Sequence, residues 1–318
     1  MLFAYRPVDG KLEPADLASA LWIDVLRPDA PEAAAVAPFV PEIPTEADMS
    51  EIEISARLYR EGTTDVMTVM VPGIDRDDKL TPVIGPAAFL LSAERLVTVR
   101  YHATRPFETY AAHAQKSALG CNSSERIFLG LAEEIIGRVA DLLESAGTAL
   151  DEVMRRVLKG GPAGPDAVLL QTALETAGRQ SEMVGNCRLS LLSLERALGF
   201  FEVSMTERGQ AKALHGAVKG LTRDIQSLEV HVDYLSNRVS QTFDATLGMI
   251  NMAQNTTVRI VSVAAVVFLP PTLIASVYGM NFHVMPELSW LWGYPMALAL
   301  MIASAAGSWA FFKWKRWL

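Results

Sequence analysis

One short segment near the C-terminus carries the side chains best suited to handling an ion. Its sequence, SVYGMNFHVMPELSW (residues 276–290), contains no Lys or Arg and joins two uncharged apolar runs. The amide oxygen of Asn281 is a neutral hydrogen-bond acceptor, Glu287 is the only carboxylate, and His283 adds a ring nitrogen. Gly279 allows the backbone to depart from a helix just before Asn281. These groups suit a cation or its water shell, although Asn281 could also be a plain helix C-cap.

The rest of the chain has no arrangement typical of an enzyme. His102, His113, His215 and His231 are scattered, and no HExxH or GxxxxGK[ST] motif is present. The segment GGPAGP (residues 160–165) is a proline-rich turn and not a phosphate-binding loop. We therefore expect no enzymatic activity and no organic cofactor.

Composition also limits the partners. The net charge of −8 argues against nucleic acid, because a nucleic-acid binder normally shows a basic face. Cys121 and Cys187 have no metal-ligand partners at motif spacing, so we interpret both as packing residues. The N-terminus, MLFAYRPVDGKLEP, lacks the apolar core of a signal peptide, so we expect the N-terminal domain to stay in the cytoplasm.

Two apolar runs near the C-terminus predict membrane spans. Residues 260–277 and 294–312 carry no charge, and each is long enough to cross a hydrocarbon core about 30 Å thick. Arg259 precedes the first run, and a basic tail follows the second, whereas the connecting loop has no Lys or Arg. Because positive residues stay on the cytoplasmic side, both termini are expected inside and the loop outside. Aromatic residues at the ends would form the interfacial belts: Trp290, Trp292, Tyr294, Trp314 and Trp317.

The elements that must position this segment come before it. Residues 1–123 mix strand-like runs such as MTVMV, AAFLLS and LVTVRYH with a helix that Thr45 can cap through EADMSEIEISARLYRE, which indicates an α/β cytoplasmic domain. Residues 124–209 form a cytoplasmic helical hairpin that is broken at the proline-rich turn. The remaining expected segments are a stalk helix (210–259), a first transmembrane helix (260–279), an external loop (280–293), a second transmembrane helix (294–312) and a basic cytoplasmic tail (313–318).

The stalk shows the clearest periodicity in the chain. Its apolar residues alternate spacings of four and three, as in a coiled-coil seam: Leu214, Val218, Leu221, Ile225, Leu228, Val232, Leu235 and Val239. This spacing favours helix-on-helix packing within or between subunits over a simple amphipathic helix. Since no proline occurs in residues 210–259, one helix could run from the soluble domain into the bilayer.

One face of the first span is small, polar or mildly apolar. The stripe leads back from Asn281 by five residues to Ser276 and then in steps of three or four to Thr272, Leu269, Ala265, Ser262 or Val261, Val258 and Asn255. Spacing alone leaves two interpretations open, namely close helix packing through small residues and the lining of a pore. Pro270 and Pro271 remove two backbone donors mid-membrane, which is tolerated in a helix bundle or beside a wet cavity.

The sequence around this segment resembles the CorA magnesium-transporter family. The resemblance rests on YGMNF followed by MPEL, after a span ending in VVFLPPTLIASVYGMN and before a second span with a basic, aromatic tail. In the soluble half, LWIDVLRPDAPE and PTEADMSEIEISARLYREG resemble segments of the enterobacterial-type members. Residues 120–210 carry no motif that matches.

The resemblance implies a homopentameric funnel in the inner membrane, with five first spans around a pore that admits Mg²⁺, and Co²⁺ or Ni²⁺ as well. Gly279, Met280 and Asn281 would form the filter at the outer mouth. The pore would be lined by Asn255, Val258, Val261, Leu269, Thr272, Ser276 and Asp244. His283 stands where many members have an acid, which leaves Glu287 alone in the loop and puts a strongly negative outer mouth in doubt.

Intracellular Mg²⁺ bound between neighbouring soluble domains closes channels of this family. The acids that the resemblance suggests for such regulatory binding are Asp75, Asp77, Asp78, Asp224 and Glu229, although a solvated acidic turn and helix face would look the same. Two rival functions stay open. One is a zinc-type transporter of the same superfamily, and the other is a non-conducting, membrane-anchored coiled-coil scaffold or sensor.

Overall fold

Among the described residues, seven strands form one mixed sheet in the N-terminal part of the chain. In the computed structural model the described residues are 1–318 apart from 52, 75–81, 160–165, 209–210, 281–284 and 316–318. The strands are β1 (Leu2–Val8), β2 (Lys11–Pro14), β3 (Trp22–Leu26), β4 (Leu58–Glu61), β5 (Thr64–Ile74), β6 (Pro82–Leu91) and β7 (Leu96–Arg100). Their order is β2-β1-β3-β7-β6-β5-β4, with β3 and β7 parallel and the other neighbours antiparallel.

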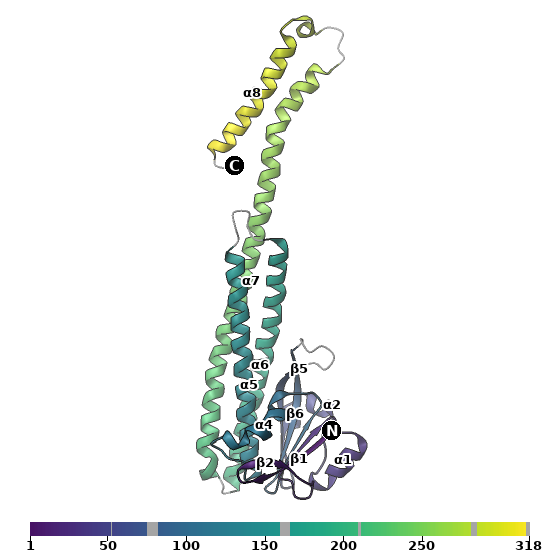
Figure 1. Cartoon of the computed structure of the whole chain (residues 1–318), viewed down its shortest axis with the longest axis vertical. Coiled ribbons are helices and arrows are strands. Elements are labelled where there is room, and N and C mark those ends of the chain that lie inside the picture. Colours follow the sequence, from purple (N-terminus) through teal and green to yellow (C-terminus); the bar gives the residue numbers. More distant parts are fainter. Residues whose placement is uncertain (52, 75–81, 160–165, 209–210, 281–284, 316–318) are drawn as a thin grey trace. The chain divides into compact units, whose positions relative to one another are not determined.

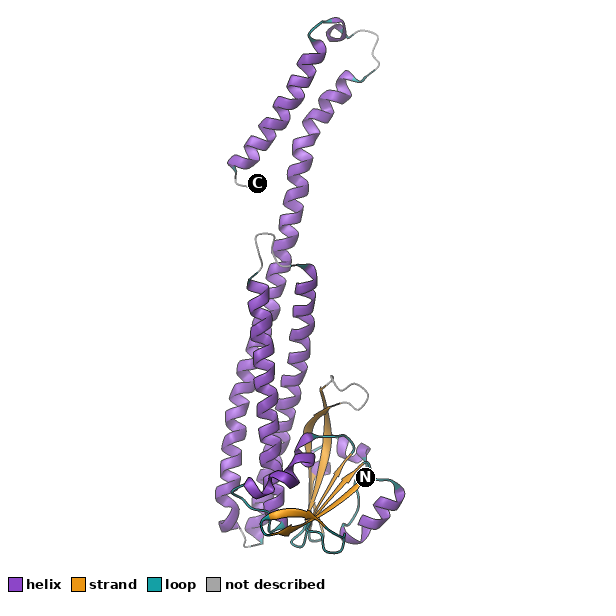
Figure 2. Cartoon of the chain, viewed as in Figure 1, coloured by secondary structure: helices purple, strands orange, loops and turns teal. Residues whose placement is uncertain are grey.

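Each face of the sheet has its own core, because side chains alternate between faces along a strand. On β6, Phe89 packs with Phe107 and Phe128, whereas Leu90 belongs to the second core with Val36 and Met49. The first core is covered by α4 (Arg105–His113) and the long helices, and the second by α1 (Ala30–Val36) and α2 (Glu46–Ser50). The short elements η1 (Ala37–Phe39), α3 (Ile54–Arg57) and η2 (Ala114–Lys116) complete this part. The predicted α/β domain is confirmed (Figure 2).

The helix predicted after Thr45 is shorter than expected. Thr45 does cap α2: its hydroxyl accepts from the Asp48 N–H at 3.3 Å, while the Asp48 carboxylate accepts from the Thr45 N–H at 2.9 Å. However, the chain becomes β4 at Leu58, where Leu58 pairs with Met67 of β5. Pairing with a long neighbouring strand outweighed the local helical pattern.

Three long helices follow the sheet: α5 (Ser124–Leu158), α6 (Ala167–Glu207) and α7 (Ala211–Tyr278). The seam of α7 packs within the same chain, since seven of its eight predicted residues are buried and Leu228 packs against them. The Leu235 side chain lies 3.4 Å from the position that a Cβ on Gly147 of α5 would occupy. Polar pairs join the same helices, including Arg238 with Asp151 and Arg188 with Asp233. The predicted coiled-coil packing is therefore confirmed, and its partners are α5 and α6.

Both cysteines lie in this core. Cys121 and Cys187 are free and buried, and burial raises the pKa of the Cys187 thiol to about 12. The thiol therefore stays protonated at neutral pH. Their predicted role as packing residues is confirmed.

The chain divides into two compact units. Unit 1 consists of residues 1–155 and 173–243, and unit 2 of residues 156–172 and 244–318. α7 passes from one unit to the other as one helix of 68 residues, about 100 Å long at 1.5 Å per residue. The predicted continuous helix is confirmed. Within unit 2, η3 (Pro286–Ser289) precedes α8 (Gly293–Trp314), as Figure 1 shows.

Candidate ion pathway

Two of the described helices are long and apolar enough to cross a membrane. They are α7, through its apolar C-terminal part, and α8. α7 stays helical through Pro270 and Pro271, although neither residue can donate a backbone hydrogen bond. Directly after them, the Thr272 hydroxyl donates to the Phe268 carbonyl at 2.7 Å. Prolines are tolerated within a membrane helix where neighbouring helices, side chains or water satisfy the carbonyls that lose their donors.

The candidate pore residues share one face of α7, in a region where residues 251–262 are all exposed. Val258, Val261 and Leu269 are 64%, 64% and 66% exposed in the single chain. Large apolar side chains so open to solvent mark a surface that lipid or another protein chain covers. The polar members of the stripe are exposed too: Asn255, Ser262, Thr272 and Ser276. Asp244, farther back on α7, is likewise exposed.

α7 ends at the predicted filter segment. The Gly279 N–H donates to the Ala275 carbonyl at 2.9 Å, and the Met280 N–H to the Val277 carbonyl at 3.3 Å. A Cβ on Gly279 would lie 3.1 Å from the Ala275 carbonyl oxygen, closer than side chains usually approach. Gly279 thus allows close backbone approach, while its φ is not positive. Met280 is 48% exposed, and both Asn281 and His283 lie outside the described residues.

The loop and α8 complete this region. Glu287 belongs to η3, in which the Ser289 hydroxyl donates to the Pro286 carbonyl at 2.8 Å. At the far end of α8, the Lys313 ammonium lies 4.7 Å from the centre of the Trp309 ring, and the Lys315 ammonium lies 5.3 Å from that of Trp314. These cation–π contacts place charge and aromatic surface together, as at a membrane interface.

Comparison with known proteins decides the family. The model of the CorA family, described as "CorA-like Mg2+ transporter protein", matches residues 18–316. A magnesium transport protein CorA from Yersinia pestis is 35% identical, with 100% of both chains covered. The chain belongs to the CorA family. The corresponding protein of Escherichia coli K12 is 32% identical, again with 100% of both chains covered.

Solved structures of low sequence identity share the fold. The CorA magnesium transporter from Methanocaldococcus jannaschii superposes with a TM-score of 0.75 at 15% identity and covers 100% of this chain and 99% of its own. The full-length CmaX protein gives 0.69 at 15% identity, over 99% of this chain and 97% of its own. The cytoplasmic domain of ZntB from Vibrio parahaemolyticus gives 0.57 at 11% identity, over 79% of this chain and 100% of its own. These likenesses concern the fold, so the ZntB match carries no argument for zinc.

Of the predicted regulatory acids of this CorA family member, the structure describes Asp224 and Glu229. Asp75, Asp77 and Asp78 lie outside the described residues. On α7, Asp224 is exposed and Glu229 is half-buried, and burial, followed by the nearby Glu195 carboxylate, raises the pKa of Glu229. In the part of the chain that the structure describes, no group of three or more His, Cys, Asp and Glu could hold a metal ion.

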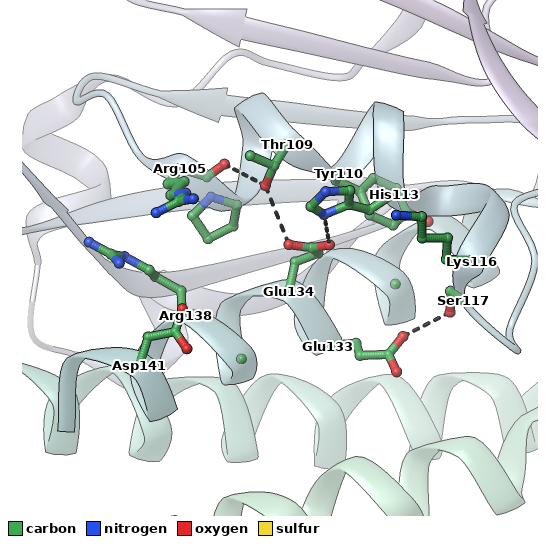
Figure 3. Close-up of a pocket in the computed structure, with 13 residues that line it drawn as sticks. Arg105, Thr109, Tyr110, His113, Lys116, Ser117, Glu133, Glu134, Arg138 and Asp141 are labelled. Atoms are coloured by element: carbon green, nitrogen blue, oxygen red, sulfur yellow. Dashed lines mark hydrogen bonds and ion pairs between the residues drawn. The ribbon is translucent and has the colours of Figure 1, made fainter. Parts of the chain in front are cut away.

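Two polar features were missed by the sequence analysis. Arg100 and Asp24 form a buried ion pair at 2.8 Å inside the sheet, and Thr98 donates to the same carboxylate at 2.8 Å. A pocket of about 470 Å³ lies between α4 and α5 and is lined by charged residues of both (Figure 3). The pocket residues are single charges spread over residues 105–141, so no local motif marks them.

Proposed function

We propose that the chain is a subunit of a channel that carries Mg²⁺ into the cell. The observation that carries this proposal is the match to the CorA family along nearly the whole chain, which ends in two apolar helices. In the sequence, Gly279, Met280 and Asn281 directly follow the end of α7 at Tyr278. Co²⁺ and Ni²⁺ would also pass, because their hydrated ions resemble hydrated Mg²⁺ in size and geometry.

Selection takes place at Gly279, Met280 and Asn281. Mg²⁺ holds an octahedral water shell at about 2.1 Å and gives it up reluctantly, so a filter that stripped the shell would impose a large barrier. Asn281 amide oxygens from several subunits instead accept hydrogen bonds from the bound waters. Neutral acceptors also let the dication leave, whereas a set of carboxylates would hold it. In this arrangement Glu287 and His283 lie in the outer loop.

Below the filter, the stripe on α7 lines the pore. Ser276, Thr272 and Asn255 offer polar contacts to the hydrated ion, and Asp244 adds a carboxylate farther toward the cytoplasm. Val258, Val261 and Leu269 form apolar constrictions that close the pore by dewetting.

The membrane potential drives the influx. Each elementary charge that crosses the membrane is worth about 2.3 kcal/mol per 100 mV, so a dication gains about 4.6 kcal/mol. The chain lies in the inner membrane with both termini in the cytoplasm, because the flanking Lys and Arg residues favour that side.

Internal Mg²⁺ closes the channel by binding between soluble domains of neighbouring subunits. The acids on the stalk, Asp224 and Glu229, and those of residues 75–78 are the proposed ligands. Burial, followed by the nearby Glu195 carboxylate, raises the pKa of Glu229, and a bound cation would offset both effects by stabilising the charged carboxylate.

The test is Mg²⁺ uptake into proteoliposomes at a fixed inside-negative voltage. Wild type is compared with Asn281→Ala, and uptake is expected to depend on voltage and to collapse in the variant. Competition by Co²⁺, Ni²⁺ and Zn²⁺ in the same assay separates a magnesium channel from a zinc-type transporter. If wild type shows no uptake even with little Mg²⁺ on the side of the cytoplasmic domains, the non-conducting scaffold becomes the favoured function.

The same vesicles test regulation. Raising Mg²⁺ on the side of the soluble domains to millimolar levels should stop uptake by wild type. A variant with Asp224→Asn and Glu229→Gln should stay active, as should one with Asp75, Asp77 and Asp78 changed to Asn. Unchanged inhibition in both variants would remove these acids from the mechanism.

A further inference from the structure

The C-terminal end of α8 combines exposed aromatic rings with two lysines. Trp309, Phe311 and Trp314 are 50%, 51% and 76% exposed in the single chain, and Lys313 and Lys315 are exposed as well. Each ammonium group lies over an indole ring, that of Lys313 over Trp309 at 4.7 Å and that of Lys315 over Trp314 at 5.3 Å from the ring centre. These five residues form one mixed surface of charge and aromatic rings, the α8 end patch.

The length of α8 sets the depth of this patch in a bilayer. Tyr294, near the start of the helix, is 76% exposed, and Trp314 lies 20 residues after it, about 30 Å along the helix at 1.5 Å per residue. This separation matches the thickness of the hydrocarbon core, so the two rings reach the headgroup regions on opposite sides, where Trp and Tyr are enriched. Trp309 lies about 7.5 Å nearer the bilayer centre than Trp314.

The Lys313 ammonium is held at the depth of Trp309. Helical side chains lean toward the N-terminus, and Lys313 follows this direction to the ring four residues before it. A charge at this depth is costly unless an opposite charge accompanies it. Glu287 is the one acidic side chain in residues 245–318, and it belongs to η3, which precedes the other end of α8. The membrane part of the same chain therefore supplies no acidic side chain to the patch.

Charge is divided unevenly along the chain. Residues 245–318 contain four Lys or Arg and one acidic residue, so their side chains carry +3, and the net −8 of the whole chain leaves −11 for residues 1–244. All four cations border the two spans on what is the cytoplasmic side of the proposed topology: Arg259, Lys313, Lys315 and Arg316. A basic cluster directly next to a membrane helix attracts anionic lipids of the cytoplasmic leaflet.

We propose that the α8 end patch binds an anionic phospholipid headgroup, with phosphatidylglycerol as the model ligand. Lys313 and Lys315 donate to the phosphate oxygens, while the Trp309 and Trp314 rings pack against the glycerol and the first part of the acyl chains. A lipid fits this surface better than a soluble anion does, because the exposed rings need an apolar partner next to the charge. This assignment rests on the membrane topology of the proposed channel and requires no ion conduction.

The experiment measures quenching of tryptophan fluorescence by brominated lipids in vesicles that contain the full-length chain and EDTA. Trp290→Phe and Trp292→Phe, on the other side of the bilayer, form the background for every variant, and Trp22 is fully buried in the sheet. The quenching signal then comes from the tryptophans at the end of α8 and just after it. Brominated phosphatidylglycerol is expected to bind at least about threefold more tightly than brominated phosphatidylcholine.

Two lysine variants and a control test the role of charge. Lys313→Gln with Lys315→Gln should lower the ratio of the two affinities to about one, whereas Lys313→Arg with Lys315→Arg should keep it within about twofold, since the charges stay. A matched control, Lys116→Gln with Lys219→Gln at exposed positions of unit 1, removes the same charge elsewhere and should leave the ratio unchanged.

The proposal is overturned if the chain with both lysines prefers neither lipid, as would follow if acidic residues of a second copy cover the patch. It is also overturned if the preference survives in the glutamine variant or falls equally in the control. Mg²⁺ uptake into parallel vesicles separates this site from the proposed channel. Uptake without a lipid preference counts against the patch alone, and a lipid preference without uptake counts against the channel alone.

Discussion

At the scale of single residues, the inner part of the sheet depends on close fits that a sequence does not display. His102 lies against β5 and β6, with its Nε2 atom 2.9 Å from the Val71 carbonyl oxygen. Burial lowers the pKa of His102, so the ring is neutral at pH 7 and packs as a largely apolar group. The strands themselves were predictable from runs such as LVTVRYH, but the packing of His102 against β5 and β6 was not.

The fit of His102 gives a prediction for Gly85. A Cβ on Gly85 would lie 2.5 Å from the His102 Nδ1 atom, so Gly85→Ala forces the ring or the strand to move. We expect a loss of about 1–3 kcal/mol in stability. The same substitution at Gly178 on α6, where nothing lies within 4 Å, should instead stabilise by up to about 1 kcal/mol. Thermal unfolding of the two variants measures both, and equal midpoints would contradict the clash.

The buried ion pair between Arg100 and Asp24 is a second contact that the sequence does not reveal. Their strands, β7 and β3, are recognisable from apolar content, and the structure pairs them in parallel with Asp24 opposite Thr98. The sequence places Asp24 and Arg100 76 residues apart, so neither residue alone indicates a buried pair. Such contacts depend on which strands pair across long sequence distances, and a local sequence pattern does not show that pairing.

At the scale of elements, the long helices were the most predictable part. The alternating spacing along α7 predicted its buried face because period alone selects which side chains lie together. It left open whether the partner was the same chain, and the structure answers with α5 and α6. The single helix predicted after Thr45 was wrong, because α2 ends at Ser50 and only the short α3 (Ile54–Arg57) follows before β4. The pairing of β4 with β5 is not visible locally.

The buried seam of α7 predicts that a Val→Ala substitution lowers stability more at a seam position than at an exposed position. Val232 on α7 is fully buried, whereas Val203 on α6 is 61% exposed. Val232→Ala removes buried methyl groups and leaves a cavity, at a cost of about 2 kcal/mol. Val203→Ala should change stability by less than about 0.5 kcal/mol. The measurement is the thermal midpoint of the full chain in detergent, and similar shifts for the two variants would show that the seam does not hold α7 in place.

At the scale of the whole molecule, the sequence predicted two apolar runs of membrane-spanning length, and the structure describes two helices long and apolar enough to cross a membrane. The stripe on α7 was predicted as a set of residues, but spacing could not choose between packing and pore lining. The exposure of Val258, Val261 and Leu269 in one chain favours contact with lipid or other subunits. Asn281 itself lies outside the described residues, so its role stays a prediction.

Two spans per chain are too few to enclose a pore, which makes an assembly a physical requirement of the proposed channel. We expect light scattering of the detergent-solubilised protein, corrected for bound detergent, to give about five times the 34.7 kDa of one chain. Cysteine placed at Ser276 on the stripe should form crosslinks between subunits, because pore-facing residues of a symmetric assembly approach one another around its axis. Cysteine at Phe268, which lies off the stripe, is the matched control, and the buried native thiols give a quiet background. A monomeric mass under conditions that support ion flux would contradict the pore, since no single chain with two spans could conduct through its own centre.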